Sequence, residues 1–218
     1  MKNKKILVFN LGGALLRPLD EVISIWCDAI RSVGLHPDVI TMFNHHEDSF
    51  QEVIIPILAK NGNWSTLQVD TIFAYVKRIF HDINTSTNLN LSSKLMAIKE
   101  RGYALGVVTD KNFESLMKGL NNIGCTSDLF DFVSTSDDGF KKPDSRVFSK
   151  MFEKYRPEEM LLIGNDHNRE YQLAQKVGIE FVAITSPQFS FNFWKAMHSN
   201  PDNIYDSVPH FIDDFLKD

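Results

Sequence analysis

The sequence predicts an α/β fold: a Rossmann-like, doubly wound parallel sheet with a helical segment inserted after the first strand. From about residue 91 onward, short apolar runs alternate with stretches of helical spacing. Strands that alternate with helices in this way pair in parallel and connect by right-handed crossovers. Between about residues 19 and 87, helical spacing recurs without a convincing strand. We therefore expect a core domain made of residues 1–16 and 88–218, interrupted by a helical domain made of residues 17–87.

The first predicted strand covers residues 6–9, four apolar residues of which two are β-branched. Such a run is typical of a strand that is buried on both faces of a parallel sheet. Polar Asn10 stands at its carboxyl end, and Gly12 and Gly13 then allow a sharp turn. Because ligands of open α/β sheets bind beyond the carboxyl ends of the strands, Asn10 is the first candidate site residue.

Three apolar stripes at helical spacing predict helices in the inserted domain, at residues 22–33, 50–58 and 69–80. Pro56 interrupts the second stripe, so we expect a kink or a late helix start there. The polar segment 84–88 predicts the hinge by which the chain returns to the core domain.

The remainder of the chain predicts four more strands, with helices between them. Apolar runs predict strands at residues 103–108, 130–134, 160–163 and 181–184. Helical spacing predicts helices at residues 92–101, 113–123, 145–155 and 169–177. The tail from Phe189 is aromatic and irregular, and it closes with an amphipathic helix at residues 210–216.

Composition and charge narrow the class of protein. Of the 218 residues, 43% are hydrophobic and 23% are charged, as in a soluble globular protein. The net charge of −5, without a strong basic run, argues against nucleic-acid binding. No apolar run reaches the roughly 20 residues of a membrane span, and the run after Lys5 is too short for a secretion signal. We expect a cytoplasmic protein. Cys27 and Cys125 form no CxxC pair, which indicates neither a zinc site nor a disulfide framework.

Polar residues follow four of the predicted strands. Asn10 ends the first strand, Thr109 the second, and Asn165 follows the fourth. Lys142 lies on the loop beyond the third strand. Because the carboxyl ends of parallel strands meet at one edge of the sheet, we expect these four side chains to gather there and form the functional site.

Several segments, in order along the chain, make the sequence similar to the haloacid dehalogenase-like superfamily over essentially its whole length. Residues 95–109 resemble the family's second motif, residues 141–148 its third and residues 162–178 its fourth. A helical cap directly after the first strand belongs to the same pattern. The resemblance implies a Rossmann-like core with residues 17–87 as the cap domain, and hydrolase activity, usually on a phosphoester.

The resemblance also implies roles for individual positions. The family's first motif is DxDGT, in which the first Asp attacks the substrate and the second acts as general acid/base. Here those positions are Asn10 and Gly12, and Ala14 replaces the Thr. The implied cofactor is Mg²⁺, held by the first Asp, the backbone carbonyl of the second and the leading Asp of the fourth motif. Asn165 stands at that last position, and Glu170 at the fourth motif's second acidic position.

The phosphate-binding positions of the family are retained. Thr109 and Lys142 match its phosphate-binding residues, and the turn at Gly13 offers backbone N–H groups. The resemblance thus implies that the partner is a small phosphorylated ligand or another anion.

The substituted positions weaken the family's chemistry at three points. The amide oxygen of Asn10 is a far poorer nucleophile than a carboxylate, and Gly12 has no side chain that delivers a proton. Asn10 and Asn165 offer Mg²⁺ neutral amides in place of carboxylates, although Asp166 or Glu170 could supply one anionic oxygen. We therefore expect a catalytically impaired protein, a pseudoenzyme that keeps a phosphate-binding pocket.

The alternative is an active hydrolase, a phosphatase that acts on a small phosphorylated metabolite through a rearranged site. Such a site would use Asp166, Glu170 or His167, the last as a substitute acid or base. Two of these residues also have a structural interpretation, Asp166 as a helix N-cap and Glu170 as a first-turn acid. The sequence specifies neither the ligand nor the oligomeric state.

Overall fold

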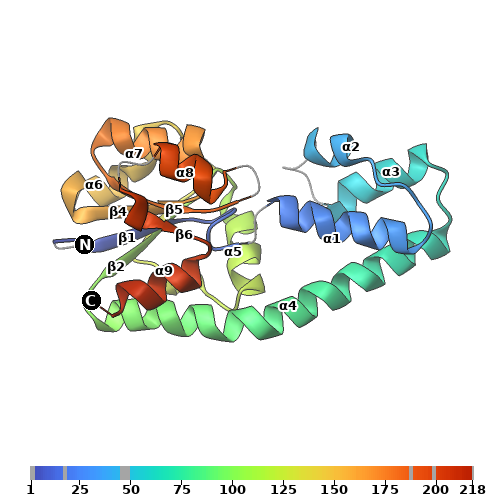
Figure 1. Ribbon diagram of the computed structural model, residues 1–218, viewed down its shortest axis with the longest axis horizontal. Helices are drawn as coiled ribbons and strands as arrows, with labels where there is room; N and C mark the ends of the chain where they lie inside the picture. The colour runs from blue at the N-terminus through green and yellow to red at the C-terminus, as the bar shows by residue number, and fades with distance from the viewer. Residues whose placement is uncertain (1–2, 17–18, 45–49, 187–188, 198–199, 218) are drawn as a thin grey trace. The chain divides into compact units, whose positions relative to one another are not determined.

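The chain forms two compact units. The computed structural model describes residues 3–16, 19–44, 50–186, 189–197 and 200–217 (Figure 1). Met1–Pro18 and Thr87–Asp218 make up one unit, here called the core unit, and Leu19–Ser86 makes up the other, the helical unit. Among the described residues, we find no helix with the length and apolar character needed to cross a membrane.

The core unit is built on a parallel sheet. Its six strands within the described residues follow the order β3-β2-β1-β4-β5-β6. The strands are β1 (Ile6–Asn10), β2 (Ala104–Val108), β3 (Phe132–Ser134), β4 (Met160–Gly164), β5 (Glu180–Ile184) and β6 (Ile204–Tyr205). In β1, Asn10 lies opposite Val108 of β2, and Phe9 lies opposite Ile163 of β4. The carboxyl ends of β1, β2 and β4 are therefore neighbours.

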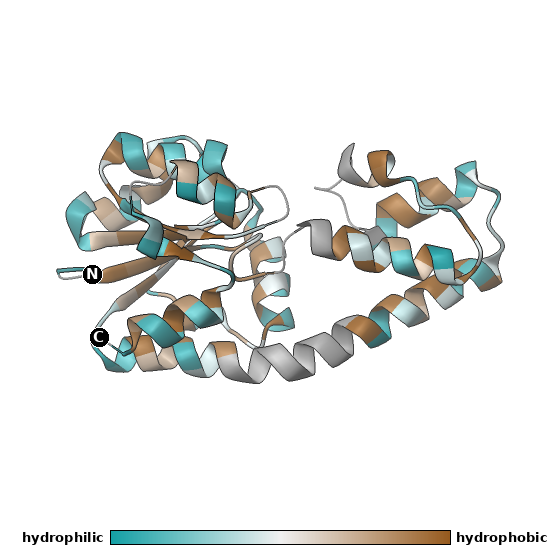
Figure 2. Ribbon diagram, viewed as in Figure 1, coloured by the Kyte–Doolittle hydropathy of each residue, from teal (hydrophilic) through white to brown (hydrophobic). Residues whose placement is uncertain are grey.

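Helices cover both faces of the sheet (Figure 1). One face carries α5 (Phe113–Asn122), α9 (Val208–Phe215) and the last turns of α4 (Thr66–Glu100); the other carries α6 (Ser149–Phe152), α7 (Gln172–Val177) and α8 (Phe191–Met197). Alternation along β1 serves both layers, because Leu7 and Phe9 pack into the first and Ile6 and Val8 into the second. The strands are accordingly hydrophobic along their length (Figure 2). This arrangement confirms the predicted doubly wound α/β fold.

The helical unit confirms the predicted helical insertion after the first strand. It contains α1 (Leu19–Ser32), α2 (Val39–Asn44), a π-helical turn (Phe50–Ile54), α3 (Ile55–Asn61) and the first part of α4. Its own apolar core includes Ile30, Met42, Ile54 and Ile72, all fully buried. Pro56 lies in the first turn of α3, where a missing backbone N–H costs no helical hydrogen bond. The late helix start is therefore confirmed.

Residues 84–88 are, as predicted, where the chain passes back to the core unit, but α4 runs through this segment without a break. The segment is polar, but it contains neither Gly nor Pro. Asn, Ser and Thr are only moderately poor helix formers, and none of them removes a helical hydrogen bond as Pro does. The boundary between the two units falls within this helix, between Ser86 and Thr87.

The tail and two helices also differ from prediction. The tail from Phe189 is not irregular: it contains α8 and the two-residue strand β6. The helix predicted at residues 145–155 is a 3-10 turn (Ser145–Phe148) followed by the short α6. The helix predicted at residues 169–177 begins as a π-helical turn (His167–Tyr171) and continues as α7.

Candidate functional site

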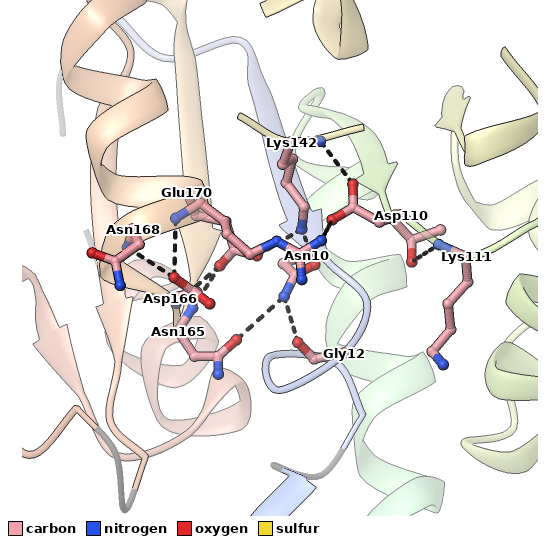
Figure 3. A network of polar contacts seen from close by, with 11 residues as sticks. Asn10, Gly12, Asp110, Lys111, Lys142, Asn165, Asp166, Asn168 and Glu170 are labelled. Atoms are coloured by element: carbon pink, nitrogen blue, oxygen red, sulfur yellow. Dashed lines mark hydrogen bonds and ion pairs between the residues drawn. The ribbon is translucent and has the colours of Figure 1, made fainter. Parts of the chain in front are cut away.

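Three strand ends and one loop supply the polar residues of the candidate site. Asn10 is the last residue of β1, Thr109 directly follows β2, and Asn165 directly follows β4. Lys142 lies between β3 and α6, and its side chain is buried. Figure 3 shows Asn10 between Lys142 on one side and Gly12 and Asn165 on the other. Of the four residues expected to converge, the structure thus brings three into direct contact: Asn10 with Lys142 and with Asn165.

The carboxamide of Asn10 has one defined orientation. Its Oδ1 accepts a hydrogen bond from Lys142 Nζ at 2.6 Å. Its Nδ2 donates to Asn165 Oδ1 at 3.2 Å and to the backbone oxygen of Gly12. An ammonium group only donates hydrogen bonds, so the amide oxygen, and not the amide nitrogen, must face Lys142. Asn10 is 5% exposed, and all the polar atoms of its side chain have partners.

Lys142 and Glu170 form a buried ion pair. Lys142 Nζ lies 2.6 Å from Glu170 Oε1, and the two side chains are 5% and 2% exposed. The other oxygen, Oε2, accepts hydrogen bonds from the N–H groups of Asn165 (2.9 Å) and Asp166 (3.1 Å). Glu170 therefore neutralises the lysine and also holds the backbone that follows β4. It is more than a first-turn acid.

Asp166 and His167 have structural partners of their own. Asp166 Oδ1 accepts hydrogen bonds from the N–H groups of Asn168 (2.8 Å) and Arg169 (3.0 Å), as a helix N-cap does. The His167 ring stacks on Tyr171 at 5.3 Å and meets the edge of Phe193 at 5.3 Å. Among the described residues, neither Asp166 nor His167 forms a side-chain hydrogen bond with Asn10.

The turn after β1 is closed by its own backbone. Gly13 has a φ of +86°, and its N–H donates to Leu16 O at 3.1 Å. A Cβ at this position would lie within 3.0 Å of the Asn165 side chain, so only glycine fits. The N–H of Gly13 is thus used within the turn rather than presented to a ligand. Gly12, by contrast, is exposed, and a Cβ placed there would meet no atom within 4 Å.

Asp110 is a site residue that the sequence analysis missed. Its Oδ1 accepts a hydrogen bond from the Lys142 N–H at 2.8 Å (Figure 3). Its Oδ2 forms an ion pair with the Arg169 guanidinium. Asp110 therefore fixes the loop that carries Lys142 against the segment after β4. The signal was present, because Asp110 directly follows Thr109 at the same edge of the sheet.

Comparison with known proteins places the chain in a family. The family model described as haloacid dehalogenase-like hydrolase matches residues 34–184, which is more than half of the chain. The chain belongs to the haloacid dehalogenase-like hydrolase family. The match begins beyond the β1 strand and the turn that follows it, so Asn10 and Gly12 lie outside the matched residues.

Similar proteins share this fold. The chain is 31% identical over 105 residues to the glyceraldehyde 3-phosphate phosphatase of Methanothermobacter thermautotrophicus, a match that covers 44% of each chain. It is 22% identical to the phosphoglycolate phosphatase of Vibrio cholerae, covering 98% of this chain and 94% of that one. The crystal structure of a predicted phosphoglycolate phosphatase from Haemophilus somnus is 20% identical, covers 100% of this chain and 98% of that chain, and has a TM-score of 0.59.

The haloacid dehalogenase-like family generally uses Mg²⁺, but the residues present here do not fit this ion. The oxygens of Gly12 and Asn165 that would coordinate it instead accept hydrogen bonds from Asn10 Nδ2. Mg²⁺ needs hard oxygen ligands, mostly anionic, in near-octahedral geometry. In the part of the chain that the structure describes, no group of three or more His, Cys, Asp or Glu residues is arranged to hold a metal.

Proposed function

We propose that the protein is a catalytically impaired member of the haloacid dehalogenase-like family that binds a phosphorylated ligand or another anion without hydrolysing it. The observation that carries the proposal is the orientation of Asn10. Its Oδ1 is neutral and engaged with Lys142, and its Nδ2 faces Gly12 and Asn165. An amide in this position presents no charged oxygen to a phosphorus atom, so the covalent route of the family lacks its nucleophile.

The residues that could replace the missing acid or base are engaged elsewhere. Gly12 has no side chain, Asp166 caps a helix, and Glu170 is paired with Lys142. His167 lies in an aromatic cluster with Tyr171. A general acid or base must reach the proton that it transfers, and these contacts favour the impaired protein over a rearranged hydrolase.

Two hydrogen-bond donors remain for an anion. A lysine ammonium has three N–H donors, and among the described contacts Lys142 uses two of them, on Asn10 and Glu170. The hydroxyl oxygen of Thr109 accepts from the Lys111 N–H at 3.2 Å, which leaves its own hydrogen for a ligand. Neutral residues at positions 10, 12 and 165 also repel a phosphate less than carboxylates would.

The names of the relatives support the ligand class. Glyceraldehyde 3-phosphate phosphatase and phosphoglycolate phosphatase are both named for small phosphorylated substrates. We therefore propose a small phosphorylated metabolite as the ligand. The proposed core domain, residues 1–16 and 88–218, carries the site. By the same resemblance, residues 17–87 act as a cap that selects the ligand. The cytoplasmic location stays a prediction.

Hydrolysis of a generic phosphomonoester, with and without Mg²⁺, tests the impairment. We expect the wild-type protein to release phosphate no faster than buffer, because losing the nucleophile alone costs roughly 10⁶-fold in other enzymes. The double variant Asn10→Asp/Gly12→Asp should gain Mg²⁺-dependent hydrolysis, since a side chain at position 12 meets open space. Wild-type hydrolysis that disappears in Glu170→Ala or Asn165→Ala would show instead that a rearranged site is active.

Thermal unfolding in inorganic phosphate tests the binding. At phosphate about tenfold above Kd, linkage stabilises the folded state by about 1.4 kcal/mol, which raises Tm by about 3–6 °C for a chain of this size. Thr109→Val should reduce this shift, whereas Thr71→Val, an exposed threonine of the helical unit, should leave it unchanged. No shift at millimolar phosphate would remove the anion-binding part of the proposal.

A further inference from the structure

The substituted half of the site is held together by one amide nitrogen. Asn10 Nδ2 donates to the Gly12 backbone oxygen and to Asn165 Oδ1, and so joins the ends of β1 and β4. These are the oxygens that the family resemblance assigns to Mg²⁺. We propose that the Asn10 Nδ2 group takes the place of the divalent cation, so that this site keeps its geometry without Mg²⁺ and does not bind it.

Turning the amide over would not admit a cation at low cost. An ion that approaches the Gly12 and Asn165 oxygens meets the N–H hydrogens of Asn10 Nδ2. To present Oδ1 to the ion, the carboxamide would have to rotate and bring Nδ2 against Lys142 Nζ, which lies 2.6 Å from the present Oδ1. Two donors would then face each other at a buried position: Asn10 Nδ2 would have no acceptor there, and Lys142 would keep only its bond to Glu170. Lys142 thus locks the amide in the orientation that excludes the ion.

The charge of the site points the same way. Lys142 is neutralised by Glu170, and Asp110 is paired with Arg169. The carboxylate of Asp166 accepts two backbone N–H groups at the start of its helix. Each of these charged side chains thus has an ion-pair or hydrogen-bond partner among the described residues, so together they have little to attract a divalent ion.

The matched variants Asn10→Asp and Asn165→Asp separate the amide nitrogen from the number of carboxylates. Each adds one negative charge to the site. Asn165→Asp keeps Asn10 Nδ2 and gives it a better acceptor, whereas Asn10→Asp removes the nitrogen and turns an oxygen toward Gly12 O. Because Asn165 could turn its own amide toward a new carboxylate at position 10, the double variant Asn10→Asp/Asn165→Asp is measured as well.

The readouts are Tm in EDTA and in millimolar Mg²⁺, and titration calorimetry with Mg²⁺. We expect no Mg²⁺ response from the wild-type protein or from Asn165→Asp. In EDTA, Asn10→Asp and the double variant should unfold on the order of 5 °C lower, and Mg²⁺ should restore most of that loss. Calorimetry should detect binding to these two variants alone.

Three results would overturn the inference. The first is Mg²⁺ binding by the wild-type protein that is lost in Asn165→Ala. The second is a response of Asn165→Asp as large as that of Asn10→Asp. The third is a double variant that does not bind Mg²⁺. If Asn10→Asp fails to fold, the measurements on the wild-type protein and Asn165→Asp still test the inference. Because metal binding is measured without substrate, the inference and the proposed catalytic impairment can fail independently.

Discussion

The two halves of the candidate site differ in the kind of residue they contain. One half, Asn10, Gly12 and Asn165, is neutral, and its side chains bond to one another and to the backbone. The other half, Lys142 and Glu170, is a charged pair buried to more than nine-tenths. They meet at the hydrogen bond from Lys142 Nζ to Asn10 Oδ1 and at the one from the Asn165 N–H to Glu170 Oε2.

The difference shows which positions the fold leaves free to vary. An amide at position 10 satisfies all its hydrogen bonds, so replacing a carboxylate there leaves no polar group unpaired. Removing one member of the buried pair would leave an uncompensated charge. Lys142 and Glu170 therefore have a structural reason to be present whether or not an anion binds. The phosphate titration, rather than their presence, is what tests binding.

The largest expected effect comes from breaking the charged half. Glu170→Gln should lower the free energy of unfolding by about 3–5 kcal/mol, because Lys142 loses its counter-charge at a buried position. The matched control is Glu114→Gln, which removes an exposed ion pair with Lys118 and should leave the free energy of unfolding nearly unchanged. Urea unfolding monitored by circular dichroism measures both.

A joint replacement sharpens this prediction. Lys142→Met together with Glu170→Gln removes both charges but keeps an oxygen for the N–H groups of Asn165 and Asp166, so it should recover part of the stability lost in Glu170→Gln. If Glu170→Gln costs no more than Glu114→Gln, the two halves of the site do not differ in the way proposed.

The sequence predicted the sheet better than it predicted the ends of the chain. Each of β1 to β5 contains a run of apolar residues that is long enough to recognise, and its place in the alternation with helices gave the parallel order. β6 has only two residues, too few for any periodicity. Residues 84–88 do contain the boundary between the two units, but a helix continues through them, because polarity alone does not end a helix.

The sequence could bring the site residues to one edge of the sheet, but it could not orient them. The ends of the first and fourth strands placed Asn10 and Asn165 together, and the loop beyond the third strand added Lys142, because parallel strands share an edge. The direction of the Asn10 amide depends on which donor faces it, and the role of Asp110 depends on a loop conformation. Both depend on the tertiary structure and cannot be inferred from the spacing of residues along the chain.

The second effect concerns how tightly the neutral half is packed. Gly13→Ala should destabilise the protein by about 2–4 kcal/mol, because its Cβ would overlap the Asn165 side chain at a φ of +86°. Gly139→Ala measures the cost of the positive φ alone, about 1 kcal/mol, because Gly139 has a φ of +83° and open space around its Cβ position. Gly12→Ala, with open space and no positive φ, should change stability by less than about 0.5 kcal/mol.

These three variants are compared by urea unfolding in one buffer. Equal losses in Gly13→Ala and Gly139→Ala would mean that Asn165 moves aside freely. The neutral half would then be a loose cluster rather than a packed bridge between β1 and β4.

The smallest expected effect concerns how stability falls in acid. The amides and glycines of the neutral half do not titrate, so they contribute nothing to this pH dependence. Carboxylates elsewhere must supply it. The hydrogen bond from Lys5 holds the pKa of Glu159 at about 2, well below its ordinary value of 4.5. Burial raises the pKa of Asp131, but hydrogen bonds from the Leu105 N–H and Lys99 outweigh it and leave that pKa below 3.8.

The sign follows from linkage. A carboxyl group whose pKa is lower in the folded state stabilises the protein fully above its unfolded pKa, and this contribution is lost as the pH falls toward the folded value. Stability should therefore decline from about pH 4.5 toward pH 2. Glu159→Gln should flatten the decline, whereas Glu153→Gln, at an exposed position, should not. Asn165→Ala should lower the whole curve without changing its slope, because it removes only an amide. A changed slope in Asn165→Ala would show that the two halves of the site are coupled through a titrating group.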